Sequence, residues 1–328
     1  MKAALIAAPG ESAHYGDFAE PGDHEGRQVV ELVAAGIHPI VRGLASGQHY
    51  GSSGHWPLIP GIDAVVRSAE GVLAYSGFPQ PPYGTLAERI SVPSFLWIPL
   101  PEGADPARVA GGVNPGLASW LPLQARRTEV GRLDNVLILG ATGMAGLLAV
   151  QNARILGAKR VAGAGRDPEG LSDAVKVGAF AVALSGDRES DGAGIVQALE
   201  GSSPDIVLDF LWGEPAESTF AALGRRGLEA DRSDISYVQI GAAAGSQASV
   251  PAALLRSRKL RITGSGAGSA SIADIIAEIP RYIQFISDGA VDVPIRTFPL
   301  SMVSEAWEAA QRGRPRVVVL AGRRPSTG

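Results

Sequence analysis

Residues 135–146 read NVLILGATGMAG, and this stretch restricts the possible folds more than any other part of the chain. Val136–Leu139 is a continuous apolar run, as expected for a strand that is buried on both faces. Gly140, Gly143 and Gly146 then punctuate a turn that leads into the apolar residues of a helix. A strand, a glycine-rich turn and a helix in this order are typical of the first unit of a parallel α/β sheet.

The middle third of the chain continues this alternation. Apolar runs predict strands over 136–139, 161–165, 181–184, 206–210, 237–240 and 260–263. Helical spacing predicts helices over 143–157, 171–177, 195–199, 218–223 and 272–287. The predicted fold class is therefore α/β, with a doubly wound parallel sheet.

The two flanks differ from this middle part. Residues 1–115 are rich in Gly and Pro and show short apolar runs with little helical periodicity, which indicates a β-rich domain. After residue 288, two strand-like runs and a short helix around 304–311 indicate a return to that domain. We therefore expect a β-rich domain over 1–115, an α/β domain over 116–287, and a return to the first domain over 288–328.

Composition excludes several classes of protein. There is no cysteine, so disulfides, thiolate nucleophiles and cysteine-based zinc sites are ruled out. The 29 basic and 33 acidic residues give a formal charge of −4, which disfavours broad binding to nucleic acid or to anionic membranes. No apolar run reaches the roughly 18 residues of a membrane span. The N-terminal segment is typical of a strand rather than a signal peptide, so we expect a cytoplasmic protein.

The glycine turn predicts a site for a dinucleotide diphosphate. Its GxxGxxG spacing differs from the common GxGxxG, but both serve a tight turn, close approach of the backbone and tight helix–strand packing. The start of the helix adds free N–H groups and partial positive charge. The residues expected to contact the cofactor here are Gly140, Thr142, Gly143, Met144 and Ala145. A glycine-rich packing turn without a ligand is the alternative.

The end of the second predicted strand bears on the choice between NADPH and NADH. NAD-binding proteins usually place Asp or Glu there, to hold the ribose hydroxyls. This chain has Gly165 followed by Arg166. Glycine leaves room for a 2′-phosphate and a guanidinium pairs with it, so we predict NADPH. A slip of one residue would restore an acid at Asp167, and an ordinary solvated charge is the alternative for Arg166.

Two later strands also end in small residues. Ligands of such sheets lie along the carboxyl ends of the strands, and small residues let a flat nicotinamide ring approach the backbone. The residues expected to do so are Gly241, Ala242, Ala243, Gly264, Ser265 and Gly266. A close-packed loop or a subunit contact is the alternative.

Seven motifs are spread along nearly the whole chain. They are AAGIHP (34–39), PLIPGID (57–63), YGTLAERISVP (83–93), LILGATGMAG (137–146), YVQIGAAAG (237–245), RSRKLRITGSG (256–266) and FPLSMVSEAWEA (298–309). Together they resemble the medium-chain dehydrogenase/reductase superfamily, in its zinc-independent, quinone-oxidoreductase-like branch. The resemblance implies a GroES-like catalytic domain formed by both ends of the chain, a Rossmann domain that binds NADPH, an active cleft between them, and a homodimer.

The chain departs from the family at three places. Where the zinc-dependent branch has Gly-His-Glu, this chain has Gly61-Ile62-Asp63, so we expect no metal. His38-Pro39 stands where many relatives have Asn-Pro, and Gly116-Leu117-Ala118-Ser119 replaces a frequent Gly-Leu-Thr-Ala motif. These departures bear on the substrate more than on the cofactor.

Without zinc, the hydride acceptor must need little electrophilic help, which favours quinones and activated carbonyl compounds. A proton donor can assist, and the catalytic candidates are His38, Tyr50 and Asn114. The resemblance places His38 in the cleft and Tyr50 near the substrate mouth, and Asn114 precedes the domain junction. A histidine that is hydrogen-bonded to its loop is the alternative for His38. The resemblance also implies that Arg316 reaches the cofactor phosphate, with a solvated tail as the alternative.

The sequence therefore predicts an NADPH-dependent, zinc-independent oxidoreductase that transfers hydride to a quinone or an activated carbonyl compound. A reductase of enones or enoyl thioesters is a second hypothesis. A non-catalytic NADPH-binding sensor is a third, because several polar residues of the family are replaced.

Overall fold

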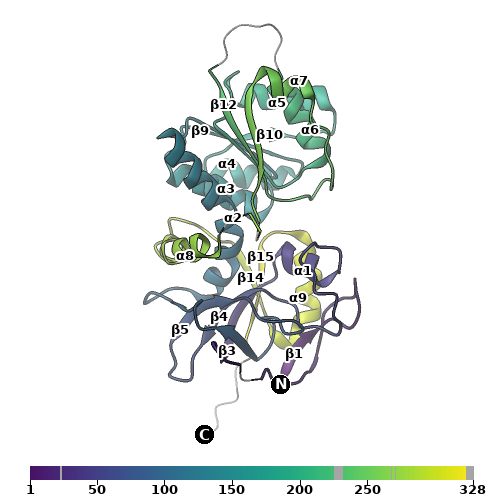
Figure 1. Ribbon diagram of the computed structural model, residues 1–328, viewed down its shortest axis with the longest axis vertical. Coiled ribbons are helices and arrows are strands. Elements are labelled where there is room, and N and C mark those ends of the chain that lie inside the picture. The colour runs from purple at the N-terminus through teal and green to yellow at the C-terminus, as the bar shows by residue number, and fades with distance from the viewer. Residues whose placement is uncertain (23, 225–231, 267, 270, 323–328) are drawn as a thin grey trace. The chain divides into compact units, whose positions relative to one another are not determined.

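The structure is a computed structural model that describes residues 1–22, 24–224, 232–266, 268–269 and 271–322. It divides into two compact units (Figure 1). Unit 1 contains Met1–Asn114 and Ile279–Gly328, and unit 2 contains Pro115–Glu278. The divisions fall within helices α2 (Pro106–Val130) and α8 (Ile272–Ser287).

Unit 2 is built on a six-stranded sheet in which all neighbouring strands are parallel. The strands are β8 (Asn135–Leu139), β9 (Arg160–Gly165), β10 (Phe180–Ala183), β11 (Ile206–Asp209), β12 (Asp234–Gln239) and β13 (Lys259–Gly264). Their spatial order is β10-β9-β8-β11-β12-β13, so the direction of winding reverses between β8 and β11. Parallel sheets bind ligands beyond the carboxyl ends of their strands at such a switch point.

The helices of unit 2 form two groups. Helices α3 (Met144–Ile155) and α4 (Pro168–Lys176) contact each other, as do α5 (Arg188–Ala198) and α6 (Gly213–Leu223) (Figure 1). The short helix α7 (Ala252–Ser257) precedes β13. The predicted doubly wound parallel sheet is confirmed, and each of its six predicted strands overlaps a strand of the structure.

Helix α2 corrects the sequence analysis, which expects little helix in the first 115 residues. It spans Pro106–Val130 and contains Pro115 and Pro122. A proline inside a helix removes a backbone donor and crowds the preceding turn. Packing overrides this preference, because Trp120 and Leu123 of the same helix are fully buried.

Unit 1 is built on a seven-stranded mixed sheet. The strands are, in spatial order, β14 (Ile295–Pro299), β15 (Arg316–Leu320), β3 (Arg27–Gly36), β4 (Asp63–Arg67), β5 (Leu73–Gly77) and β7 (Ile98–Pro99), and β6 (Arg89–Pro93) also pairs with β3. Strand β15 is antiparallel to β3, with Val319 opposite Ala35. Residues from both ends of the chain therefore share one sheet.

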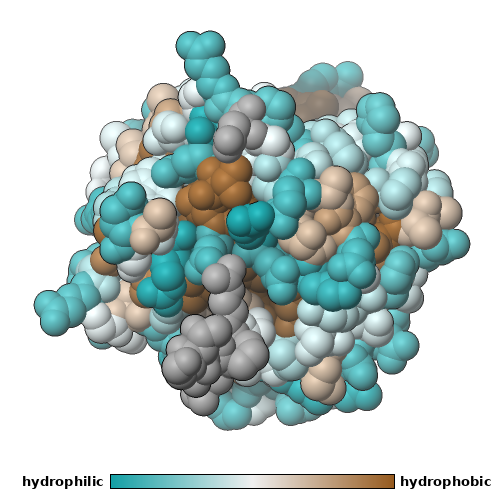
Figure 2. Space-filling view, turned by 90° about the horizontal axis from the view of Figure 1, so that it is seen from below, coloured by the Kyte–Doolittle hydropathy of each residue, from teal (hydrophilic) through white to brown (hydrophobic). Residues whose placement is uncertain are grey.

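The remaining elements of unit 1 surround this sheet. Strands β1 (Lys2–Leu5) and β2 (His14–Asp17) form a separate antiparallel pair. Helices α1 (Pro39–Ala45) and α9 (Val303–Ala309) contribute Val41, Val303 and Trp307 to the core of the unit. Within the described ranges, no helix has the length and apolar character needed to cross a bilayer. The face of the molecule in Figure 2 is largely hydrophilic, with separate apolar patches.

Candidate functional site

The turn between β8 and α3 is made of glycines that leave the start of α3 without a side-chain cap. Gly140 adopts φ +92°, a conformation that favours glycine. A Cβ at Gly146 would overlap the carbonyl oxygen of Gly140, so α3 packs directly on the turn. Gly143 is the N-cap of α3 and provides no side-chain cap, and a Cβ there would meet only the carbonyl oxygen of Gly140, at 3.6 Å. The first N–H groups of α3 therefore have no side-chain acceptor from the cap position, as an anion site requires.

The end of β9 places an exposed arginine before an aspartate that caps the next helix. A Cβ at Gly165 would overlap the side chain of Thr142, so the glycine is required by its contact with the turn. Arg166 is exposed. Asp167 is the N-cap of α4, and its Oδ2 accepts a hydrogen bond from the backbone N of Gly170 at 2.8 Å. The acid that could have contacted a ribose hydroxyl is instead engaged in holding the start of α4.

The loops after β12 and β13 lie at the same carboxyl edge of the sheet. Ala242 and Ala243 are exposed, as is Gly264. A Cβ at Gly241 would lie 2.7 Å from the carbonyl oxygen of Phe210, so this glycine is required by close contact with the loop after β11. The backbone N of Ser265 donates to the carbonyl oxygen of Gln239 at 2.8 Å, which ties the loop after β13 to the end of β12. Gly266 is exposed too, so the small residues of both loops are available at this edge.

A buried polar cluster lies in unit 1. Nε2 of His38 is 3.4 Å from Oδ1 of Asp63, and the hydroxyl of Tyr75 donates to Oδ2 of Asp63 at 2.9 Å. His38 is only 1% exposed, and a Cβ at Gly36 would lie 2.6 Å from its Nε2, so glycine makes room for the ring. Burial raises the pKa of Tyr75 well above its ordinary value, with Asp63 adding to the shift. The phenol therefore stays protonated and acts as a donor to the carboxylate.

The side chain of Arg316 is buried in unit 1. It is 3% exposed, and its Nη1 donates to the carbonyl oxygen of Ile37 at 2.9 Å. Burial lowers its pKa to about 10, and the negative charge of Asp63 acts in the opposite direction. Arg316 is therefore not a solvated tail residue, because its guanidinium is enclosed in unit 1, and its contact with the cofactor phosphate stays a prediction.

The other two catalytic candidates lie in different surroundings. Tyr50 is 79% exposed, and its ring is 4.2 Å from that of His49. Asn114 lies half-buried in α2. Among the described residues, no hydrogen bond or ring contact joins Tyr50 or Asn114 to the His38–Asp63 pair. Their roles as catalytic residues stay predictions.

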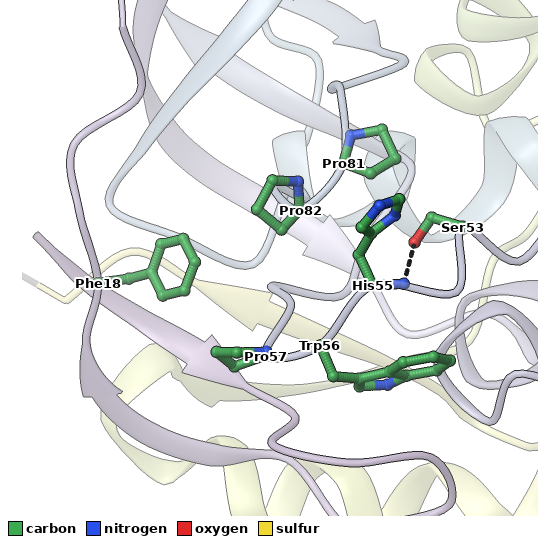
Figure 3. A pocket seen from close by; sticks show the side chains of 7 residues that line it. All are labelled: Phe18, Ser53, His55, Trp56, Pro57, Pro81 and Pro82. Carbon is green, nitrogen blue, oxygen red and sulfur yellow. Dashed lines mark hydrogen bonds between the residues drawn. The ribbon is translucent and has the colours of Figure 1, made fainter.

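Unit 1 also contains a cavity of about 580 Å³ (Figure 3). Its lining is mostly apolar and consists of Phe18, Ser53, His55, Trp56, Pro57, Pro81 and Pro82. The backbone N of His55 donates to Oγ of Ser53 at 3.3 Å, which holds one wall. A second cavity of about 200 Å³ shares Ser53, Pro81 and Pro82. None of the three catalytic candidates lines either cavity.

Comparison with known proteins agrees with this geometry. No family model matches the chain. A probable NADPH-dependent quinone reductase of Emericella nidulans is 29% identical, over 93% of this chain and 96% of that protein. The quinone oxidoreductase of Thermus thermophilus has a similar structure, with a TM-score of 0.78 and 27% identity over 98% of this chain and 100% of that chain. These two proteins are named as a quinone reductase and a quinone oxidoreductase, which is consistent with the predicted resemblance to the quinone-oxidoreductase-like branch of the medium-chain dehydrogenase/reductase superfamily.

The chain also matches part of a much larger protein. A phenolphthiocerol/phthiocerol polyketide synthase subunit of Mycobacterium tuberculosis is 28% identical over 89% of this chain, which corresponds to 13% of that subunit. Members of this superfamily branch and a segment of a polyketide synthase therefore share sequence with the chain.

Metal binding has no support among the side chains that the structure describes. No three His, Asp or Glu residues of the described ranges are placed to hold a metal ion. The absence of zinc stays a prediction that rests on Gly61-Ile62-Asp63 in place of Gly-His-Glu and on the lack of cysteine.

The loop after β11 was not among the predicted parts of the cofactor site. Gly140 on one side and Gly241 on the other both lie close to residues 210–211 of this loop. The signal that could have found it is the acid at the end of an otherwise apolar strand, IVLD, which ends in Asp209. An acid is fully buried there, where the other strands end in glycine, alanine, leucine or glutamine.

Proposed function

We propose that the chain is an NADPH-dependent oxidoreductase that transfers hydride to a quinone or another activated carbonyl compound. The observation that carries this proposal is the end of β9, where Arg166 is exposed and Asp167 is engaged as the cap of α4. A 2′-phosphate there would meet the Arg166 cation, while Asp167 is bonded to the backbone of α4. The related quinone reductases support the same cofactor and reaction class.

The turn after β8 supplies the diphosphate site in this proposal. Gly143 leaves the first N–H groups of α3 open, and the partial positive charge of the helix start stabilises an anion. Thr142 packs against Gly165, which fixes the turn next to the end of β9. The diphosphate and the 2′-phosphate would thus be held by neighbouring parts of unit 2.

NADPH, when bound, supplies the hydride. The small residues Gly241–Ala243 and Gly264–Gly266 would allow the nicotinamide ring to lie against the backbone. The protein then contributes orientation and exclusion of water more than chemistry. For the proton, Tyr50 is the candidate whose side chain is open to a ligand, whereas His38 is enclosed beside Asp63.

A reductase of enones or enoyl thioesters is the second candidate function. The observation that favours it is the match to a segment of a polyketide synthase subunit, over 89% of this chain. Such an enzyme would use the same cofactor site and a different acceptor. We also propose, from the family resemblance, a cytoplasmic homodimer without a metal.

Two measurements on the purified protein test the proposal. Calorimetric titration would compare the dissociation constants for NADPH and NADH, and we expect NADPH to bind more tightly. NADPH oxidation, followed by its absorbance, would then be measured with a panel of quinones, a panel of enones and enoyl thioesters, and no acceptor. Turnover with quinones supports the first function, and turnover with enones alone supports the second.

The same measurements can overturn the proposal. Tight NADPH binding without turnover of any acceptor would favour a non-catalytic sensor. Failure to bind either nucleotide would remove the basis of every function considered above.

A further inference from the structure

The carboxylate of Asp209 accepts three hydrogen bonds at the carboxyl edge of the unit 2 sheet. Asp209 is the last residue of β11 and is fully buried. Its Oδ1 accepts from the backbone N of Leu211 at 2.8 Å and of Trp212 at 2.9 Å. Its Oδ2 accepts from the hydroxyl of Tyr237 at 2.6 Å. Burial raises the pKa of Tyr237 well above its ordinary value, so the phenol keeps its proton and donates.

The backbone of Asp209 reaches a second loop. Its carbonyl oxygen accepts from the backbone N of Ile240 at 2.7 Å and of Gly241 at 3.1 Å. One residue therefore holds both the loop after β11, residues 210–213, and the beginning of the loop after β12, residues 240–245. The Tyr237 hydroxyl adds a third connection, because Tyr237 belongs to β12.

The loop 210–213 lies between the two parts of the proposed cofactor site. On the side of the diphosphate turn, a Cβ at Gly140 would lie 3.2 Å from side-chain atoms of Phe210 and Leu211. On the other side, the backbone N of Ala243 donates to the carbonyl oxygen of Phe210 at 3.3 Å, and that of Ala244 to Leu211 at 2.7 Å. The loop therefore separates the diphosphate turn from the small residues proposed to contact nicotinamide.

The backbone of this loop is strained at Trp212. Its φ of 55° and ψ of −161° are unfavourable for a residue with a Cβ. The bond from its backbone N to Asp209 and the edge contacts of the indole with Phe220 and Tyr237, at 6.0 and 6.2 Å between ring centroids, hold it in place. Strain that the surroundings maintain is found more often at ligand sites than elsewhere.

We infer that Asp209, supported by Tyr237, is a positioning residue that sets the separation of the diphosphate and nicotinamide loops, and that NADPH affinity depends on it. Asp209 does not touch the cofactor in this proposal. It acts through Leu211, Trp212 and Gly241, whose backbone places the two loops. The inference rests on the NADPH binding proposed above.

The test uses a matched pair of carboxylates at opposite ends of β11. Asp205 lies next to its first residue, and its Oδ2 accepts from the backbone N of Asp134 at 2.6 Å and of Asn135 at 2.9 Å. Asp205 thus also holds two backbone donors, at the edge of the sheet away from the proposed site. The variants are Asp209→Ala, Asp209→Asn and Asp205→Ala, each examined by thermal unfolding and by NADPH titration at a temperature where it is folded.

We expect Asp209→Ala to raise the Kd for NADPH about tenfold or more, since two backbone donors of the loop lose their acceptor. Asp205→Ala should lower the unfolding temperature while its Kd stays within about twofold of the wild type. Asp209→Asn should restore most of the affinity, because an amide oxygen still accepts from the backbone of Leu211 and Trp212. If Asp209→Asn recovers the NADPH affinity, the acceptor oxygen of residue 209 matters and its negative charge does not.

The inference is overturned if Asp209→Ala binds NADPH with the affinity of the wild type, or if Asp205→Ala loses as much affinity as Asp209→Ala. If Asp209→Ala does not fold, Tyr237→Phe decides the question, because it removes one hydroxyl and keeps the ring. An increase of about threefold in its Kd supports the inference, and an unchanged Kd contradicts it. Absence of NADPH binding by the wild type would instead contradict the proposed function itself.

Discussion

Gly146 of helix α3 lies so close to Gly140 at the end of β8 that a Cβ at position 146 would overlap the carbonyl oxygen of Gly140. The backbone cannot relax without separating the helix from the strand, since the atoms that would collide are main-chain atoms of the turn. This contact holds the start of α3 in front of the proposed diphosphate site.

Gly146→Ala is therefore expected to destabilise the protein by about 1–3 kcal/mol or more, the range for overpacked positions. Urea unfolding would measure the change. Gly143→Ala is the matched control, because a Cβ there would lie 3.6 Å from the carbonyl oxygen of Gly140 and the φ of −85° suits alanine. We expect this variant to lose only about 0.5–1 kcal/mol, the difference between glycine and alanine at an N-cap. Equal destabilisation by both substitutions would contradict the steric argument.

Arg166→Ala tests the choice of cofactor. A guanidinium–phosphate pair is lost, so the Kd for NADPH should rise about 10- to 100-fold, whereas the Kd for NADH should change little. Calorimetric titration with both nucleotides measures the difference. Added salt should weaken NADPH binding to the wild type more than to the variant, because the pair is exposed and screened. An equal loss of affinity for both nucleotides would argue against a 2′-phosphate contact.

Asp63→Asn tests whether charge holds the buried cluster of unit 1. Asp63 faces His38, accepts from Tyr75 and provides negative charge near the enclosed Arg316. Removing one partner of a buried ion pair typically lowers the free energy of unfolding by about 3–5 kcal/mol. Here the charge of Arg316 would stay buried without the negative charge of Asp63. Tyr75→Phe is the control and should cost about 1 kcal/mol, the value of one hydrogen bond. If chemical unfolding shows the two variants to be equally stable, charge is not what maintains the cluster.

Acid should weaken the ion pair between Glu129 of α2 and Arg261 of β13 in unit 2. Hydrogen bonds from Arg261 and Arg126 lower the pKa of Glu129 from 4.5 to about 2. A carboxyl group with a lowered folded pKa contributes stability above its unfolded pKa, and this contribution is lost as the pH falls from about 4.5 to about 2. Unfolding free energies measured across this range should fall less steeply for Glu129→Gln than for the wild type.

The chain offers a control for the acid dependence. Asp234 also pairs with Arg126 and Arg261, and its pKa is lowered chiefly by a hydrogen bond from Lys259. Lys259→Ala should thus remove a different part of the same dependence. A Glu129→Gln variant with the full acid slope of the wild type would show that the exposed pairs do not contribute.

The central strands of unit 2, β8 and β11, were predictable because their apolar runs are buried and are bounded by glycine or charged residues. Val136–Leu139 illustrates this, since a strand buried between two helical layers leaves no polar position in the run. Helix α2 was not predictable in the same way. Its Pro115 and Pro122 are local signals against a helix, and the burial of Trp120 and Leu123 outweighs them.

Some residues of the candidate site were likewise predictable from local sequence, and others were not. The glycine turn and Arg166 follow from local sequence, because a tight turn needs glycine wherever the chain makes it. Asp167 could not be assigned from sequence, since a residue that either contacts a ribose or caps a helix has the same neighbours in both cases. Its bond to the backbone N of Gly170 decides between these roles. The burial of Arg316 could not be read from the sequence either, because it follows from the packing of unit 1.

By itself the sequence determined the order of the strands of unit 2, the place of the phosphate turn and the family resemblance, because periodicity and glycine spacing are local properties of the chain. Only the tertiary structure decided which polar groups meet. Asp209 and Tyr237 are 28 residues apart, and Asp63 lies 25 residues from His38. Such pairs form because packed strands bring distant residues within hydrogen-bonding range in an interior where an unpaired polar group is costly.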